Sequence, residues 1–349
     1  MSEVAMRQQK CVKIGAVDLF CGIGGLTHGL QMAGVTVKAG FDIDSSCQFA
    51  FGSNNAGAEF VHRDVQSIDF REIEHYYRDA DITALVGCAP CQPFSGHNRC
   101  RPKSEADCSL VTKFSGLVRE GRPDFVSMEN VPGLQKLPVF NGFVETLEAL
   151  GYAVNHAIVQ CELHGVPQKR RRLVLLASRL GQISMLPRTG SPTTVGDCIR
   201  NLPPILEGSS HPGDPAHVSL PLSPLNKKRI IQSRPGRSWK DWDDGLVNDC
   251  QRKSHYPAPY GRMSWDGLAP TITTQFCYYS TGRFGHPEQN RAISVREGAM
   301  LQTFPGDYSL IDEDNPATVR ELSRQIGNAV PVNLGRAIGL SLMGALNER

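Results

Sequence analysis

The stretch VKIGAVDLFCGIGGL at residues 12–26 decides the fold. Its first half is β-prone and leads directly into a turn that contains Gly22, Gly24 and Gly25. An apolar stretch with helical spacing then runs to Ala33. A strand, a glycine-rich turn and a helix in this order are typical of nucleotide-binding α/β domains, because the glycines let a ligand approach the positively polarised start of the helix. The stretch therefore predicts a Rossmann-like domain with its ligand at this turn.

An acidic pair follows the next β-prone run. Asp42 and Asp44 close the strand predicted over 35–41. A carboxylate about 20 residues after such a turn can accept hydrogen bonds from ribose hydroxyls. The turn reads F-x-G-x-G-G rather than G-x-G-x-x-G, which provides less for a pyrophosphate. Together these features predict a nucleoside cofactor and leave NAD and S-adenosylmethionine both open.

Short β-prone runs alternate with helical segments through the first half of the chain. We predict strands at 12–18, 35–41, 81–87, 124–128, 152–159 and 172–177, and helices at 45–51, 140–150, 294–302 and 331–346. Strands that alternate with helices predict a parallel α/β sheet with helices on both faces. Residues 187–270 are instead rich in proline, glycine and polar side chains. Long irregular segments of this kind in an enzyme usually carry binding function.

The composition is that of a globular chain of about two domains. Of the 349 residues, 40% are apolar and 21% are charged. We find no apolar run near the roughly 18 residues that a membrane span needs, and the first residues lack the apolar core of a secretory signal. Eleven cysteines without such a signal predict reduced thiols and a cytoplasmic location.

Two local segments carry most of the positive charge that could attract nucleic acid, since the net charge is only +2. Residues 169–172 read KRRR, and residues 226–240 contain six basic side chains and no acidic one. Trp239 and Trp242 lie at the end of the second segment. A basic stretch with aromatic side chains can follow a phosphate backbone, although a solvated surface loop explains the same composition.

Cys91 lies in LVGCAPCQPFSG at residues 85–96 and has several possible roles. A zinc site needs about four ligands, and no second CxxC pair accompanies Cys88 and Cys91. A thioredoxin-like pair normally follows the first strand of its domain, whereas this pair follows a later one. We interpret Cys88 as a small apolar filler and Cys91 as a nucleophile at the carboxyl edge of the sheet, where open α/β folds bind ligands. Packing remains the alternative for Cys91.

Charged side chains follow two further predicted strands. Glu129 ends the run PDFVSMEN, where burial in a cleft can raise the pKa of a carboxylate and let it hold a proton. Its alternative role is a structural salt bridge. Arg170 and Arg172 alternate in QKRRR, so an extended strand places both on one side, where they can bind a phosphate or a carbonyl oxygen. A basic strand edge that prevents aggregation is the alternative for the arginines.

These motifs give the chain a clear resemblance to the DNA (cytosine-5)-methyltransferase family. Eight blocks stand in the family's order over nearly the whole length. They are DLFCGIGGL (18–26), FDID (41–44), RDV (63–65), GCAPCQPFSG (87–96), MENV (128–131), QKRRR (168–172), REGAMLQTFP (296–305) and QIGNAVP (325–331). The combination of PCQ-x-FS, ENV and Q-x-R-x-R is specific even without the others.

The resemblance implies covalent chemistry on a flipped cytosine. A thiolate of Cys91 would add to C6 and make C5 able to attack a methyl group carried on sulfur. The resemblance gives Glu129 the N3 position of the base and Arg172 the O2 atom. Arg170 would meet the DNA backbone or support the loop. Arginines nearby would lower the pKa of the Cys91 thiol.

The resemblance also implies a cofactor site and a domain division. S-adenosylmethionine would be lined by Phe20, Gly22, Gly24, Asp42, Ile43, Asp64, Pro90 and Asn328, with Asp42 on the ribose and Asp64 on the adenine amine. No metal is expected. Residues 1–187 and 322–349 would form the catalytic and cofactor-binding domain. Residues 188–321 would form a mostly irregular or β target-recognition domain.

The expected substrate is a specific sequence of double-stranded DNA. We expect contacts from Gln92, Ser95, Arg170, Arg262 and Arg283, the last two in the candidate base-reading loops 254–262 and 275–283. A monomer in the cytoplasm of a prokaryotic or phage-infected cell, associated with the nucleoid and away from membranes, fits this interpretation. A cognate restriction endonuclease that acts separately is a further partner that a restriction-modification role would allow.

Three alternatives and one departure from the family pattern accompany this interpretation. A tRNA cytosine-5 methyltransferase uses a similar motif set but usually has threonine at the position of Ser95. An NAD-dependent dehydrogenase explains the glycine turn and Asp42 but leaves Cys91 and Glu129 unexplained. A catalytically silent DNA-binding module does not need either side chain. The family's D-x-R element is absent from SEADCSLV (104–111), which puts a cofactor-side or loop-closing contact in doubt.

Overall fold

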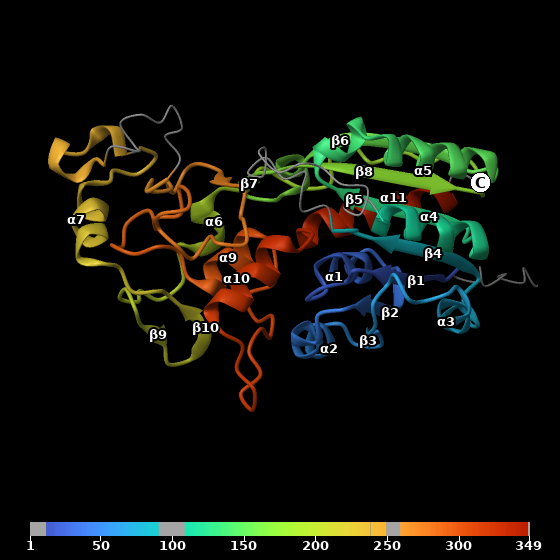
Figure 1. Ribbon diagram of the computed structural model, residues 1–349, viewed down its shortest axis with the longest axis horizontal. Coiled ribbons are helices and arrows are strands. Elements are labelled where there is room, and N and C mark those ends of the chain that lie inside the picture. Colours follow the sequence, from blue (N-terminus) through green and yellow to red (C-terminus); the bar gives the residue numbers. More distant parts are fainter. Residues whose placement is uncertain (1–11, 91–108, 238, 249–258, 348–349) are drawn as a thin grey trace, which may run out of the picture.

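The computed structural model describes residues 12–90, 109–237, 239–248 and 259–347 (Figure 1). A seven-stranded sheet in the order β3-β2-β1-β4-β5-β8-β6 forms its larger half. Its strands are β1 (Ile14–Leu19), β2 (Thr36–Asp42), β3 (Glu59–His62), β4 (Ile82–Gly87), β5 (Phe125–Asn130), β6 (Ala153–Gln160) and β8 (Arg171–Ser178). The α/β class and the six predicted strands are confirmed, and β3 is an addition.

The sheet is mixed, which corrects the expectation of a parallel one. Strands β1 to β5 pair in parallel, whereas β8 runs antiparallel to both β5 and β6. The reason is the short connection over residues 161–170, because a parallel crossover takes a dozen or more residues. The strand that carries Arg172 therefore begins, rather than ends, at the edge where β5 ends.

Helices cover both faces of the sheet, as the alternation of its buried side chains requires. In β8, Leu173 and Leu175 face one apolar core, whereas Val174 and Leu176 face the other. The first core includes α3, α4 and α5, and the second includes α1 and α11. The helices are α1 (Gly25–Met32), α2 (Gln48–Asn54), α3 (Arg71–Glu74), α4 (Ser109–Gly121), α5 (Pro138–Ala149) and α11 (Val332–Asn347), and short 3-10 turns occupy η1 (Ser45–Cys47), η2 (His75–Tyr77), η5 (Pro132–Lys136) and η6 (Cys161–His164).

The other half of the described chain consists of short elements joined by irregular segments (Figure 1). They are β7 (Gln168–Lys169), α6 (Val195–Ile199), β9 (Ser210–His211), β10 (Asp214–Val218), α7 (Pro224–Gln232), η7 (Trp239–Asp241), η8 (Asp244–Leu246), β11 (Ala269–Pro270), α9 (Val295–Leu301) and α10 (Val319–Asn328). One apolar core joins α6, α9 and α10 and also includes Ile23 and Ala50 of the first half. The predicted domain boundaries stay a prediction, since this core crosses them.

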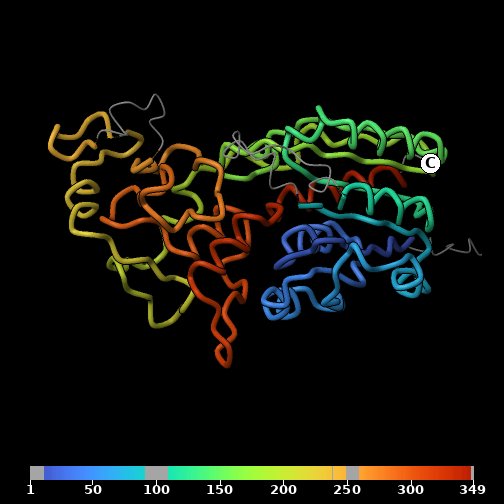
Figure 2. The backbone as a smooth tube through the Cα atoms, in the orientation of Figure 1, coloured from blue at the N-terminus to red at the C-terminus, as the bar shows by residue number. Residues whose placement is uncertain are grey.

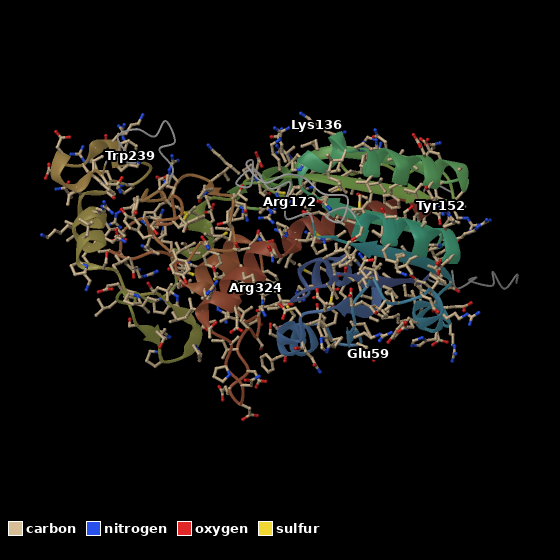
Figure 3. All side chains as sticks on the ribbon, in the orientation of Figure 1. Glu59, Lys136, Tyr152, Arg172, Trp239 and Arg324 are labelled. Atoms are coloured by element: carbon tan, nitrogen blue, oxygen red, sulfur yellow. The ribbon has the colours of Figure 1, made fainter. Side chains whose placement is uncertain are left out.

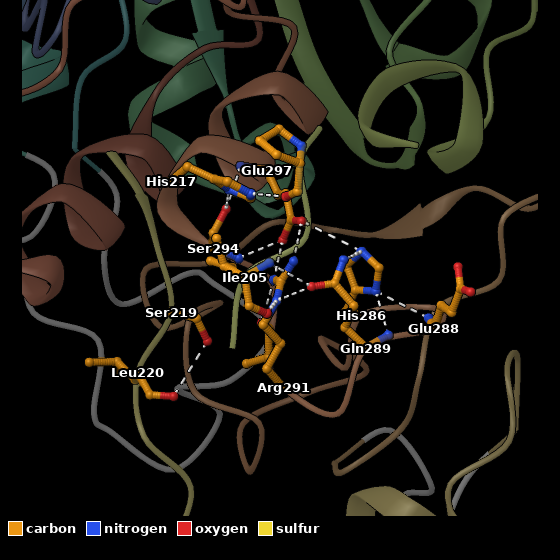
Figure 4. A network of polar contacts seen from close by, with 12 residues as sticks. Ile205, His217, Ser219, Leu220, His286, Glu288, Gln289, Arg291, Ser294 and Glu297 are labelled. Carbon is orange, nitrogen blue, oxygen red and sulfur yellow. Dashed lines mark hydrogen bonds and ion pairs between the residues drawn. The ribbon is translucent and has the colours of Figure 1, made fainter. Parts of the chain in front are cut away.

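A buried ion pair fixes the start of α9 in this half (Figure 4). The two terminal guanidinium nitrogens of Arg291 each donate to Glu297 at 2.7 Å, and Ser294 caps the helix through a reciprocal capping box with Glu297. Although burial alone raises the pKa of Glu297, the bonds from Arg291 hold it below its usual value. Burial lowers the pKa of the adjacent His286 to about 4, so this imidazole is neutral at pH 7. The predicted helix at 294–302 is thus confirmed and anchored by charge.

Helix α11, the last one described, packs back against α1, the first one described. Figure 2 shows the red C-terminal segment running back among the blue and green elements of the first half. Helix α11 packs along α1, and glycines on both helices permit the close approach. A Cβ at Gly29 would collide with the carbonyl oxygen of Val332 and the amide of Arg336, and one at Gly335 would lie 2.9 Å from the carbonyl oxygen of Leu26. The expectation that the last helix joins the cofactor domain agrees with this packing.

The segment Val319–Leu346 is long and apolar enough to cross a membrane by length and composition, contrary to the expectation that no such run exists. It is not one straight rod here, because α10 ends at Asn328 and α11 begins at Val332. More than half of its most apolar window is buried inside the protein. Core helices of folded proteins commonly satisfy the same criterion, so this segment is explained by packing.

We expect Gly29→Ala to lower the free energy of unfolding by about 1–3 kcal/mol, because the added methyl group overpacks the contact between α1 and α11. Urea denaturation followed by circular dichroism measures the change. Gly116→Ala in α4 is the matched control, since no atom lies within 4 Å of a Cβ placed there. The control should gain about 0.5–1 kcal/mol from helix propensity. Equal effects of the two substitutions would contradict the packing described here.

Candidate active site and cofactor edge

The ends of β4 and β5 are joined by two side-chain hydrogen bonds. The Cys88 thiol donates to Oε2 of Glu129 at a sulfur–oxygen distance of 2.8 Å. One residue further along each strand, the amide of Asn130 donates to the carbonyl oxygen of Ala89 at 2.9 Å. The two strands are parallel neighbours, so their carboxyl ends lie together at one edge of the sheet. This edge contains the GCAPC and MENV motifs side by side.

Glu129 is a buried carboxylate with a basic neighbour. It is 2% exposed, and Nε of Arg172 lies 2.9 Å from its Oε1 atom. This contact lacks the direction of a hydrogen bond, so Oε1 is a buried acceptor without a hydrogen-bond donor. A buried acceptor of this kind is costly to leave unpaired. The pair can therefore present one carboxylate oxygen and one guanidinium to a polar ligand.

Figure 3 places Arg172 near the middle of the molecule, where the sheet meets the second half of the chain. Its side chain is 14% exposed, so it is accessible from one side. Glu129 and Arg172, two of the three predicted catalytic residues, are therefore adjacent. The third, Cys91, lies outside the described residues, as do the predicted DNA contacts Gln92 and Ser95.

Arg170 does not share the face of Arg172, which corrects the prediction from their alternation. The chain leaves the strand conformation at Arg170, between β7 and β8. The Arg170 side chain is 1% exposed. Its guanidinium donates to the carbonyl oxygens of Ile272 at 3.0 Å and Ala329 at 3.2 Å. Burial and the nearby positive charge of Arg172 lower its pKa to about 9, so it remains charged at pH 7.

Gln168 makes a second set of contacts between the same segments. Its amide nitrogen donates to the carbonyl oxygen of Leu301 and to the side chain of Gln302, and its amide oxygen accepts from the backbone of Ile272. Gln168 and Arg170 thus connect the start of the Arg172 strand to α9, to the segment around Ile272 and to the end of α10. Gln168 and Arg170, the first and third residues of QKRRR, are therefore structural cross-links between these segments.

The glycine-rich turn after β1 is fixed by Asp42. Its two carboxylate oxygens accept hydrogen bonds from the amides of Gly22 at 2.8 Å and Asp44 at 2.9 Å. Burial raises the pKa of Asp42, and these two amides oppose that shift. Phe20 and Gly22 have left-handed φ values of 63° and 51°. The carboxylate of Asp42 therefore lies against the glycine-rich turn. Each of its oxygens keeps a lone pair that can accept a hydrogen bond from a hydroxyl group.

The other predicted cofactor residues follow the neighbouring strands at the same edge. Ile43 is 64% exposed, so its side chain is accessible to a ligand at this edge. Asp64 and Pro90 are exposed after β3 and β4. Gly24 has a φ of 87° and lies against the side chains of Asn55 and Tyr308. The structure thus gathers the predicted residues of β1 to β4 at one edge.

Helix α10, which ends at Asn328, contacts this edge from a distant part of the sequence. Asn328 is exposed at the end of α10. An ion pair of 2.7 Å between Arg324 and Asp44, and a hydrogen bond of 2.9 Å from Gln325 to Ser46, connect α10 to the loop that follows β2. Arg324 is labelled between the two halves of the protein in Figure 3. These contacts were not predicted, because charge pairs so far apart in sequence leave no local pattern.

Arg262 is buried in the second half, contrary to the prediction of a DNA contact. It is 4% exposed, and its guanidinium donates to the backbone carbonyls of Ile230, Ser233 and His286, at 2.8 Å in each case. The side chain therefore holds several loop segments together. Arg283 is half-buried, and its Nε atom has no hydrogen-bond partner. Of these two arginines predicted to contact DNA, Arg283 is the one with a guanidinium nitrogen that has no hydrogen-bond partner among the described residues, and this nitrogen is buried.

Comparison with known proteins accounts for this arrangement. The family model for the C-5 cytosine-specific DNA methylases matches residues 14–344. The chain belongs to this family. The methylase M.HgiDII from Herpetosiphon aurantiacus, a Type II enzyme, is 46% identical over 96% of this chain and 98% of its own length. The Type II methyltransferase M.Eco47II from Escherichia coli is 29% identical over 95% of this chain and 79% of its own length.

Solved structures agree on the fold. A methyltransferase encoded within an Escherichia coli prophage superposes with a TM-score of 0.75 at 22% identity, over 96% of this chain and 100% of that one. A DNMT2 variant from Spodoptera frugiperda superposes with a TM-score of 0.66 at 17% identity, over 96% of this chain and 100% of that one. At these identities the likeness concerns the fold alone. With the family assignment, the protein is a sequence-specific DNA (cytosine-5)-methyltransferase, and neither the dehydrogenase nor the tRNA alternative is favoured.

One contact of a site residue was missed from the sequence. Cys88 packs against the apolar core, as expected of a small apolar filler, and its thiol also donates a hydrogen bond to Glu129. Burial, followed by the charge of Glu129, raises the pKa of this thiol well above its ordinary value, so it is protonated at pH 7. The available signal was position, because Cys88 and Glu129 each follow a buried strand, and those strands are neighbours.

We expect Arg170→Lys to lower the free energy of unfolding by about 3 kcal/mol, because one ammonium group cannot satisfy carbonyls on two separate segments. Arg171→Lys, at an exposed neighbouring position, is the control and should change it by less than about 0.5 kcal/mol. Thermal and urea denaturation measure both. If Arg170→Lys were as stable as the wild type but bound DNA more weakly and with less salt dependence, Arg170 would contact the DNA backbone, as the sequence predicted.

Proposed function

We propose that this methyltransferase works through a covalent adduct between Cys91 and C6 of a cytosine that has been flipped out of duplex DNA. C5 of cytosine is a poor nucleophile while the ring stays conjugated. Addition of a thiolate to C6 breaks the conjugation and makes C5 enamine-like. After the methyl group is acquired, C5 loses its proton and the thiolate leaves. A duplex hides C5 within the base stack, so flipping must precede attack.

The pair of Glu129 and Arg172 is the observation that supports this mechanism. Negative charge develops on the ring when the thiolate adds, and a proton or donor at N3 stabilises it. The Oε1 atom of Glu129 suits this position when it carries a proton, because no hydrogen-bond donor from the described part of the chain occupies it. The Arg172 guanidinium beside it suits O2 of the base. Cys91 follows the strand that ends next to Glu129, which agrees with its proposed role.

The cofactor edge suits S-adenosylmethionine, the methyl donor that the family implies. The bound cofactor supplies an electrophilic methyl group on a sulfonium. Asp42 is the proposed partner of the ribose hydroxyls, since each of its oxygens already accepts one amide and keeps a further lone pair. Ile43 would cover a face of the adenine ring, and Asp64 would accept from its amino group. The remaining cofactor residues proposed are Phe20, Gly22, Gly24, Pro90 and Asn328.

The face that binds the DNA backbone is proposed to include the turn after α7. Arg234 and Arg237 are exposed there, and within the described residues neither side chain has an ion-pair or hydrogen-bond partner. Pro235 of this turn bridges to Arg262, which in turn bridges to Gly285, two residues after Arg283. The buried Arg262 thus positions a cluster of exposed or half-buried arginines. Free guanidiniums on a rigid support suit a phosphate backbone.

The cellular setting follows from the proposed substrate. Double-stranded DNA with a specific sequence is the partner, and the protein acts as a monomer in the cytoplasm, at the nucleoid of a prokaryotic or phage-infected cell. Type II relatives such as M.HgiDII support a place in restriction-modification, with a separate endonuclease as the companion enzyme.

We expect wild-type protein to form a stable covalent complex with substrate DNA that contains 5-fluorocytosine, because fluorine at C5 cannot leave as a proton. Denaturing gel electrophoresis detects the complex. Cys91→Ser should form none, and Glu129→Gln should lower kcat by about 10²- to 10⁴-fold. Cys161→Ser, which changes a second buried thiol in the adjacent turn η6, should be trapped like the wild type. An active Cys91→Ser variant would refute the adduct.

We expect Arg234→Gln and Arg237→Gln each to reduce the slope of log binding constant against log salt concentration by about one, because each removes one phosphate contact. Fluorescence anisotropy with labelled duplex DNA measures the slope. Arg71→Gln on α3 is the control, since this exposed arginine lies at the other end of the protein (Figure 1). Unchanged slopes for both variants would place the backbone contacts elsewhere.

A further inference from the structure

We propose that Cys88 is a positioning residue for methyl transfer, whose thiol binds one oxygen of Glu129 and so keeps the other available to the cytosine. The inference rests on the proposed role of Glu129. It assigns a function to a cysteine other than the nucleophile. The thiol would touch neither substrate nor cofactor and would act through the carboxylate.

The two oxygens of Glu129 have different surroundings. Oε2 accepts from the Cys88 thiol at 2.8 Å, whereas Oε1 has Nε of Arg172 at 2.9 Å without a directed hydrogen bond. Guanidinium and carboxylate groups often bind through two parallel hydrogen bonds. The contact between Glu129 and Arg172 is not of that kind, since one of the oxygens is occupied by sulfur. The Cys88 thiol thereby opposes rotation of the carboxylate into a closed ion pair.

Cys88 is held firmly enough to do this. Its backbone amide donates to the carbonyl oxygen of Leu19 at 3.3 Å, and the next residue, Ala89, accepts from Asn130. Its side chain packs against the apolar core beneath the sheet. The thiol therefore cannot move away from Glu129 without disturbing the ends of three strands.

The thiol acts as a donor and not as a thiolate. Burial, followed by the negative charge of Glu129, raises its pKa well above the ordinary range. Arg172 and Arg170 are the positive groups near it, and they oppose the shift without reversing it. The Cys88 S–H group thus faces Oε2 of Glu129 over the neutral pH range. A methyl group at this position would leave Oε2 free to turn to Arg172.

The distance predicts which substitution restores the contact. A separation of 2.8 Å is usual for O–H···O hydrogen bonds. A serine hydroxyl keeps a donor on the same Cβ atom, and a small shift of the Glu129 carboxylate makes up for the shorter C–O bond, whereas alanine removes the donor. Cys161 supplies the matched control, because it is buried in the adjacent 3-10 turn η6 and its thiol makes no hydrogen bond to Glu129.

The test is steady-state kinetics of full-length Cys88→Ala, Cys88→Ser and Cys161→Ala with substrate DNA and S-adenosylmethionine. We expect Cys88→Ala to lower kcat by about 10- to 100-fold through misplacement of Glu129, with both KM values and the melting temperature near those of the wild type. Cys88→Ser should recover most of kcat, and Cys161→Ala should keep it. Wild-type kcat in Cys88→Ala, or no recovery in Cys88→Ser, would overturn the proposal.

A double-substitution cycle separates this inference from the proposed role of Glu129. If Cys88 acts through Glu129, adding Cys88→Ala to Glu129→Gln should lower kcat no further. A full additional loss would show that Cys88 acts by another route. An active Glu129→Gln variant would refute the role of Glu129 itself. Should Cys88→Ala fail to fold, Cys88→Val fills the same space without a donor and takes its place in every comparison.

Discussion

The buried guanidinium of Arg170 is the contact on which the relation of the two halves depends. It binds carbonyl oxygens from the segment around Ile272 and from the end of α10, while it lies directly before the strand that begins with Arg171 and Arg172. A buried charge is tolerated because several oxygens surround it. The position of Arg172 beside Glu129 is thus set by the same short segment that ties the second half to the sheet. Loss of the Arg170 contacts would therefore alter both the position of Arg172 and the attachment of the second half to the sheet.

The site itself follows from the geometry of parallel strands. Five neighbouring parallel strands end at one edge, so residues that lie far apart in the sequence come together there. The glycine turn, Asp42 and the α10 contacts form the proposed cofactor part of that edge, whereas Cys88, Glu129 and Arg172 form the proposed catalytic part. Among the buried side-chain atoms of Cys88, Glu129 and Arg172, Oε1 of Glu129 is the one without a hydrogen-bond partner within the described residues. A ligand that donates a hydrogen bond to an unpaired buried oxygen removes the cost of leaving that oxygen unsatisfied, so it binds most favourably there.

Sequence patterns predicted the elements and the adjacency of Glu129 and Arg172, but not the partners of polar side chains. Alternation along QKRRR assumed an unbroken strand, and the chain leaves that conformation at Arg170. Arg262 was expected on a DNA-reading loop because arginine binds bases, yet backbone carbonyls surround it. The antiparallel course of β8 depended on the length of a connection and not on periodicity. Hydrogen bonds between distant residues, such as that of Cys88, leave no periodic signal.

The packing of α11 along α1 has a consequence for the order of folding. The two helices lie far apart in the sequence, and glycines on both of them allow their backbones to touch. Contacts between residues of high sequence separation form slowly, because the entropy of closing the long intervening loop must be lost first. We therefore expect the edge where α10 contacts Asp44 and Ser46, after β2, to be completed late in folding.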